Sequence, residues 1–123
     1  MELSTEQNEE KKVLIVHVKG LHQRPDDAFD VLQFVINSFD EHGRTRILID
    51  LTEAEIKGGL MDNYKAANPS PELAKDIKKF RFAIVSSVVT ENDEFFENLA
   101  ANRGHRVRFF DDYNIAMEWL GKL

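Results

Sequence analysis

The residues best suited to chemistry lie in one stretch, Arg44–Leu60, which reads RTRILIDLTEAEIKGGL. An apolar run leads into Asp50 and Thr52, and a polar connection then reaches the pair Gly58 and Gly59. A buried strand that ends in a carboxylate and passes through a loop into a helix is how α/β proteins build a site at the carboxyl edge of a sheet. The stretch therefore predicts a candidate site at a strand end.

Asp50 is the candidate carboxylate, and two roles are open to it. It could be a phospho-acceptor or a metal ligand, as in a response-regulator receiver domain, with Ser86 or Ser87 ending the next strand. However, the first apolar strand ends in Lys19 without the acidic pair that would hold Mg²⁺, which needs oxygen ligands. The last strand leads into two aspartates where a receiver needs a lysine. We expect the commoner role, in which Asp50 accepts hydrogen bonds from the loop that it introduces.

The two glycines offer a second candidate feature. With Lys57 beside them they could bind an anion at a helix N-terminus. Neither G-x-G-x-x-G nor G-x-x-x-x-G-K-[ST] surrounds them, so a turn that needs positive φ explains the pair equally well. A ligand or partner at this edge would meet residues of the loop, the helix after it and the next strand end, namely Asp50, Thr52, Lys57, Gly58, Gly59, Tyr64, Ser86 and Ser87.

The sequence offers no set of residues for catalysis or for a metal. The absence of cysteine excludes thiol catalysis, disulfides and Cys-type zinc sites. No G-x-S-x-G motif surrounds the two serines. The histidines share no helical or strand spacing, so we expect them to be solvated or hydrogen-bonded rather than metal ligands: His17, His22, His42 and His105. We therefore expect no enzymatic activity, no metal and no cofactor.

Composition and charge narrow the class of protein. Apolar residues make up 42% and charged residues 31% of the 123 residues, as in an ordinary globular domain. The net charge of −6 and the scattered basic residues argue against nucleic-acid binding, because a phosphate backbone repels an acidic surface. The polar start, MELSTEQNEEKK, is unlike a signal peptide, and no apolar run approaches the ~20 residues of a membrane span. We expect one cytoplasmic domain over residues 1–123 without a membrane span.

The elements that position these residues alternate between strand and helix. After a polar lead-in at 1–12, with a short first strand open at 2–5, buried strands are expected at 13–19, 47–51, 82–87 and 106–110. Helical periodicity predicts helices at 25–41, at 59–79 with an interruption near Asn68-Pro69, at 93–103 and at the end of the chain. The last helix should turn Ile115, Ala116, Trp119 and Leu120 inward. This alternation predicts one α/β domain with a mostly parallel sheet.

Three segments resemble the SpoIIAA-like branch of the STAS superfamily (sulfate transporter and anti-sigma factor antagonist domains), also grouped as STAS/SEC14-like. They are VLIVHVKG, RILIDLTEAEIKGGL, and KKFRFAIVSS followed by VRFFDDYNIAMEWL. The middle segment is similar to the family's strand–DL(S/T)–loop–GL pattern, and the end is similar to its closing strand, acidic turn and short helix. The resemblance implies a SpoIIAA-like fold: a mixed sheet of four or five strands, an antiparallel N-terminal strand, and helices mainly on one face.

The same resemblance bears on function. Anti-sigma factor antagonists carry a phosphorylatable serine beside the glycine that opens the helix, where this chain has Lys57-Gly58-Gly59. That switch is not carried over, and Thr52 is the nearest hydroxyl. Relatives of SEC14 bind lipids in larger domains with extra helices. We predict a non-catalytic regulatory or protein-interaction module that binds another protein or a second copy of itself. The alternative is a domain that binds a small apolar, anionic or lipid-like ligand at the loop 52–60.

Overall fold

The computed structural model describes residues 1–122, and its strands form one five-stranded sheet in the order β1-β2-β3-β4-β5. β1 (Glu2–Asn8) pairs antiparallel with β2 (Val13–Gln23). The remaining neighbours, β3 (Arg46–Lys57), β4 (Arg81–Val85) and β5 (Arg106–Phe110), continue the sheet in parallel. The predicted mixed, mostly parallel sheet is confirmed.

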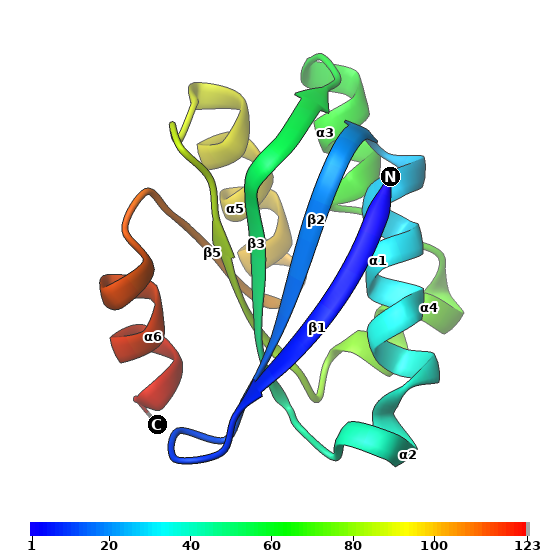
Figure 1. Ribbon diagram of the computed structural model, residues 1–123. Helices are drawn as coiled ribbons and strands as arrows, with labels where there is room; N and C mark the ends of the chain where they lie inside the picture. Colours follow the sequence, from blue (N-terminus) through cyan, green and yellow to red (C-terminus); the bar gives the residue numbers. More distant parts are fainter. Residues whose placement is uncertain (123) are drawn as a thin grey trace.

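Helices cover the two faces of the sheet unequally (Figure 1). Four of them pack on one face, which we call the four-helix face, and one packs on the other, which we call the α6 face. The first four are α1 (Asp26–Asn37), α3 (Leu60–Ala66), α4 (Pro71–Ile77) and α5 (Glu91–Asn102), and the fifth is α6 (Tyr113–Gly121). A single helical turn, α2 (Phe39–His42), follows α1. Helices therefore lie mainly on one face, as expected.

Alternation along the strands feeds the core on both faces, because successive side chains of a strand point to opposite sides. Ile47 and Ile49 of β3 join the core of the four-helix face, whereas Leu48 between them joins the core of the α6 face. On α6 the prediction for Ile115 is wrong: this side chain is 54% exposed, and Met117 is buried instead. Within residues 1–122 no other helix packs beside α6 on this face, so residues on the flank of its apolar stripe meet solvent.

Two strands run further than their sequence indicated. After a register shift between His17 and Lys19, β2 and β3 pair again as far as Gln23 and Lys57. The segment 52–57, expected as a loop, is therefore strand, and only Gly58 and Gly59 connect β3 to α3. β1 likewise extends beyond the short strand considered at 2–5. These additions are mostly exposed on both sides, so they lack the run of buried apolar residues that marks a central strand.

Side chains cap the N-termini of three helices. Ser70 caps α4, where its hydroxyl accepts the N–H of Leu73 at 3.3 Å, and Thr90 caps α5 by accepting the N–H of Asp93 at 3.2 Å. Asp112 caps α6 by accepting the N–H of Ile115 at 3.0 Å. Over residues 1–122, no helix has both the length and the apolar character needed to cross a membrane.

Candidate functional site

Polar side chains form two clusters on opposite faces of the sheet, one across the middle of β2 and β3 and the other just beyond the end of β2. On the α6 face, Glu6, His17 and Asp50 form a chain of hydrogen bonds that we call the imidazole bridge. On the four-helix face, three buried side chains form what we call the buried arginine cluster: Arg24, Asn63 and Asp93.

The imidazole bridge holds Asp50 from two sides. Oδ1 of Asp50 accepts hydrogen bonds from the N–H of Thr52 at 2.9 Å and from its hydroxyl at 2.7 Å, which is the role expected from the sequence. Oδ2 of Asp50 lies 2.9 Å from Nδ1 of His17, its register partner on β2. Nε2 of His17 lies 2.7 Å from Oε1 of Glu6 on β1. One imidazole thus joins three adjacent strands through two carboxylates.

The carboxylates control the protonation of His17. The hydrogen bond to Glu6, and then the one to Asp50, raise the pKa of His17 against the opposing effect of burial. Burial acts to raise the pKa of Asp50, but hydrogen bonds from Thr52 and His17 outweigh it, and the pKa lies below its ordinary value. Only an imidazolium can donate to both carboxylates at once. A protonated ring bonded at both nitrogens has no lone pair for general-base chemistry.

The buried arginine cluster joins the end of β2 to two helices. Nη1 of Arg24 donates to Oδ1 of Asn63 on α3 at 2.9 Å and to Oδ1 of Asp93 on α5 at 2.8 Å. The guanidinium carbon also lies 5.4 Å from the ring centroids of Phe96 and Phe109. All three polar residues are buried, so the charge pair depends on these partners rather than on solvent.

Gly58 allows β3 to approach this cluster. Its φ is +140°, and a Cβ at this position would lie 3.1 Å from Cβ of Arg24 and 3.2 Å from Cβ of Asp62. The N–H of Arg24 donates to the carbonyl of Lys57 at 2.9 Å, which holds the two segments together. A Cβ on Gly59 would meet nothing within 4 Å. Close approach and positive φ therefore require glycine at 58 but not at 59.

The N-terminus of α3 is already occupied by a carboxylate of the chain. Oδ2 of Asp62 accepts the N–H of Gly59 at 2.9 Å. Nζ of Lys57 lies 3.2 Å from Oε1 of Glu55, so the neighbouring cation is also paired. A second anion at this position would be repelled by Asp62, because like charges at short range oppose each other.

The eight residues singled out in the sequence do not form one site. Gly58, Ser86 and Ser87 line a strand-end crevice of about 380 Å³ together with the buried arginine cluster. Ser86 is buried and its hydroxyl donates to the carbonyl of Val88 at 3.3 Å, whereas Ser87 is exposed. Asp50 and Thr52 belong instead to the opposite face.

The three remaining residues of that set, Lys57, Gly59 and Tyr64, lie outside the crevice. Lys57 is exposed and pairs with Glu55 on its own strand. Tyr64 is exposed on α3, and the guanidinium of Arg103 lies 5.8 Å from its ring centroid. The ring of Tyr64 therefore faces solvent and does not line the crevice.

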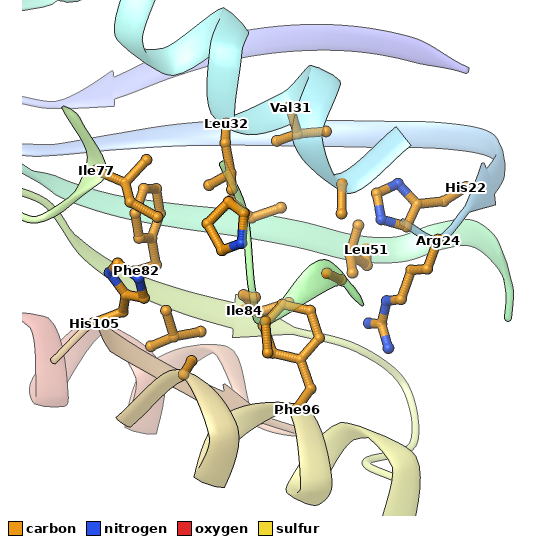
Figure 2. Close-up of a pocket in the computed structure, with 17 residues that line it drawn as sticks. His22, Arg24, Val31, Leu32, Leu51, Ile77, Phe82, Ile84, Phe96 and His105 are labelled. Carbon is orange, nitrogen blue, oxygen red and sulfur yellow. The ribbon is translucent and has the colours of Figure 1, made fainter. Parts of the chain in front are cut away.

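A small core cavity adjoins the buried arginine cluster. Figure 2 shows His22 and Arg24 at one end of it and His105 at the other, with apolar side chains such as Phe82 and Ile84 between them. Its volume is about 50 Å³, which at ~10–15 Å³ per water has room for a few waters only. Burial, and then Arg24, lowers the pKa of His22 to about 4, and burial also lowers the pKa of His105. Both rings are neutral near pH 7.

His42 is hydrogen-bonded, as expected, but the expectation is wrong for His105, which is buried with no hydrogen-bond partner for its Nδ1 among the described residues. Nε2 of His42 donates to the carbonyl of Val35 at 3.0 Å, and its Nδ1 accepts the N–H of Arg44 at 2.9 Å. In the part of the chain that the structure describes, no group of three or more His, Asp or Glu side chains is arranged to hold a metal ion.

The sequence did not predict that the residues of either cluster would meet. One signal was present for the imidazole bridge: VLIVH and RILID are buried runs that each end in a polar residue, and in-register pairing brings His17 beside Asp50. For the buried arginine cluster only Asp93 had a signal, because Thr90-x-x-Asp93 resembles a capping box. Nothing local marks Arg24 as its partner, 69 positions earlier in the chain.

Two solved structures are similar to this one over nearly the whole chain. An uncharacterized protein of the DUF3478 family with a SpoIIAA-like fold, from Shewanella loihica PV-4, is 20% identical, with a TM-score of 0.56 over 97% of this chain and 92% of that one. The anti-sigma factor antagonist SpoIIAA in its unphosphorylated form is 6% identical, with a TM-score of 0.57 over 99% of this chain and 100% of that one. No family model and no curated protein matches the sequence. The likeness therefore concerns architecture, and the chain has the SpoIIAA-like (STAS) fold.

Proposed function

We propose that this protein is a non-catalytic regulatory or protein-interaction module that binds a partner protein through the outer surface of α3 and the loop between β4 and α5. The observation that carries the proposal is a set of exposed apolar side chains on α3 and on the loop between β4 and α5, of which Val88 also lines the strand-end crevice. We call this group the α3 patch; it consists of Leu60, Met61, Tyr64 and Val88. Met61 is 64% and Val88 is 70% exposed, and exposed apolar groups of this kind mark interaction surfaces when they are contiguous.

The placement of α3 supports this role. Leu60 and Tyr64 lie one helical turn apart with Met61 beside them, so they share one side of the helix. The opposite side of α3 is fixed in the protein by the buried residues Asn63 and Ala66. A short helix that is anchored on one side presents its other side as a preformed surface. Burying each exposed side chain would contribute roughly 1.5–3 kcal/mol, which suits the few anchors that dominate protein interfaces.

Hydrogen bonding of the polar candidates supports a role without catalysis. Both oxygens of Asp50 are engaged, one by Thr52 and the other by His17. The hydroxyl of Ser86 is turned to a backbone carbonyl rather than to a base. Groups that are saturated in this way are poor nucleophiles and bases.

Charge substitutions in the α3 patch test the proposal. Met61→Asp should abolish retention of the partner in affinity capture from source cells, because it places a charge within the buried part of the interface. Ile115→Asp is the matched control, since Ile115, at 54% exposed, is another exposed apolar residue on a different helix. The free energy of unfolding of both variants should lie within about 0.5 kcal/mol of the parent value, as expected for exposed positions. A partner that Met61→Asp retains and Ile115→Asp loses would place the interface elsewhere.

Self-association is tested on the same variants. Sedimentation of the purified protein over a range of concentrations shows whether the partner is a second copy of the chain. A dimer that persists in Met61→Asp would contradict use of the α3 patch for that contact.

A second candidate function, binding of a small ligand, is favoured by the strand-end crevice. Its volume of about 380 Å³ lies within the ~300–1,000 Å³ range of small-molecule sites. Native mass spectrometry of the purified protein would then show retained mass, and Ser87→Trp, at an exposed position of the lining, should remove that mass. A clean mass together with partner loss in Met61→Asp would favour the interaction module.

A further inference from the structure

A row of arginines lies at the amino ends of the parallel strands, at the opposite edge of the sheet from the α3 patch. Arg46 of β3, Arg81 of β4 and Arg106 of β5 are successive register partners. Register partners on parallel strands lie side by side, about 4.8 Å apart, and point to the same face. Arg108 follows two residues after Arg106 and points to that face as well. We call these four residues the arginine row.

Hydrogen bonds to backbone carbonyls orient the guanidinium groups of Arg81 and Arg106 but do not neutralise their charge. Nη2 of Arg81 donates to the backbone carbonyl of Trp119 at 2.8 Å. The guanidinium carbon of Arg81 lies 4.0 Å from the ring centroid of Trp119. Nη2 of Arg106 donates to the carbonyls of Lys78 and Lys79, each at 3.3 Å. Carbonyl oxygens and an aromatic face orient a guanidinium, but they bring no negative charge.

Most cations of the row have no ion-pair partner in the part of the chain that the structure describes. Among residues 1–122, Arg46, Arg81 and Arg106 form no ion pair, and Arg108 reaches Glu97 only at 3.8 Å. Burial, and then the positive charges of Arg106, Arg46 and Arg108, lower the pKa of Arg81. A chain with a net charge of −6 therefore concentrates unneutralised positive charge at one edge of its sheet.

The surface beside the row is hollowed. An open depression of about 580 Å³ adjoins Arg46, and its charged residues are four cations and two anions: Lys11, Lys12, Arg46, Lys122, Glu10 and Glu118. The local balance is positive, unlike that of the whole chain. The sequence scatters these basic residues, and the fold brings them together.

We propose that the arginine row binds a short acidic segment of a partner protein. Guanidinium groups bind carboxylates in a planar, two-pronged geometry. A line of long, flexible arginines can reach the carboxylates that an extended peptide presents on one side every second residue, about 6.6 Å apart. The acidic remainder of the surface disfavours a nucleic acid, whose phosphates continue beyond the row and meet repulsion there. This surface is separate from the α3 patch and does not depend on the function proposed for it.

Fluorescein-labelled hexaglutamate is a direct probe of the row. Anisotropy titration of the full chain at about 20 mM salt, where screening is weak, should give saturable binding that weakens as salt is added. The triple variant Arg46→Ser/Arg106→Ser/Arg108→Ser should bind at least about tenfold more weakly, since each exposed pair contributes a few-fold. Arg81 is left in place because it packs on Trp119.

The matched control removes the same charge at the other edge of the sheet. Lys19→Ser/Lys57→Ser/Lys65→Ser lowers the net charge equally and should change hexaglutamate binding less than about threefold, because its cations lie far from the row. If the triple arginine variant fails to fold, Arg106→Ser alone, at an exposed position, serves in its place. Equal losses in the arginine and lysine variants would show a global charge effect and overturn the proposal.

Chemical-shift mapping locates the contact. Hexaglutamate should perturb amides at residues 46, 81 and 106–108 rather than those at 58–64. Absence of saturable binding by the parent protein, or perturbation confined to 58–64, would overturn the proposal. Tighter binding of a 12-nucleotide single-stranded DNA than of hexaglutamate would overturn the choice of an acidic protein segment.

Discussion

The buried arginine cluster and the imidazole bridge lie on opposite faces of the sheet, and their surroundings differ. The side chains of Arg24 and Asp93 are each 4% exposed, whereas that of His17 is 30% exposed. Side chains of α3, α5 and β5 enclose the first pair. On the other face α6 covers the core near Met117 but leaves the imidazole bridge half open to water.

The difference shows how burial determines whether an ion pair contributes to stability or titrates with pH. A buried ion pair has paid for its desolvation, so loss of one partner leaves an uncompensated charge in a low-dielectric interior. A partly exposed pair is screened by water and contributes little to stability. It can, however, take up and release a proton in a useful pH range. The buried arginine cluster is therefore structural, and the imidazole bridge is titratable.

The largest effect is expected from breaking the buried pair. Arg24→Met keeps most of the side-chain volume but leaves Asp93 charged and unpaired, which should lower the free energy of unfolding by about 3–5 kcal/mol in urea titration at pH 7. Arg24→Met/Asp93→Leu should cost less than the sum of its two single changes, because the unpaired charge is gone. A loss for Arg24→Met no larger than that for His17→Gln would remove the contrast between the clusters.

A smaller effect is expected where the backbone approaches the cluster. Gly58→Ala should cost about 2 kcal/mol, because alanine at a φ of +140° is strained and its Cβ would crowd Arg24. Gly59→Ala is the neighbouring control and should cost under about 1 kcal/mol, the loss expected at an N-cap position. Thermal and urea unfolding of both variants measure the difference. Equal losses would show that close approach at Gly58 is unimportant.

The smallest effect concerns the imidazole bridge and depends on pH. Because the pKa of His17 is raised in the folded protein, its stabilising effect is fully present below the unfolded value of about 6.5 and is lost as pH rises through the folded value. The stability difference between the parent and His17→Gln should therefore be larger near pH 5.5 than near pH 9. It should stay under about 1 kcal/mol, since solvent screens the pair.

NMR titration of the ring tests the cause of that shift directly. The pKa of His17 should lie above 6.5 in the parent and should move down in Glu6→Gln, since the hydrogen bond to Glu6 is the largest cause. A value at or below 6.5 in the parent would contradict the bridge.

Features that depend on neighbouring residues could be predicted from the sequence, whereas features that depend on strand pairing or helix packing could not. The bounds of β5 and the caps Ser70 and Thr90 could be predicted because they depend on residues within a few positions of one another. The exposed continuation of β3 could not, because pairing with β2 rather than burial makes it a strand. The exposure of Ile115 depends on the absence, within residues 1–122, of a helix beside α6.

Residues close together in the chain specify the alternation of strand and helix, the apolar faces of the sheet and the ends of several helices. Which polar residues meet depends on the folded arrangement: Arg24 with Asp93, His17 with Glu6 and Asp50, and the arginines of three strands with each other. The physical reason is range. Periodicity and capping act between neighbours in the chain, whereas charge pairing and burial depend on register and on how helices dock. Asp50 illustrates both, since its bond to Thr52 follows from local sequence and its bond to His17 follows only from the sheet.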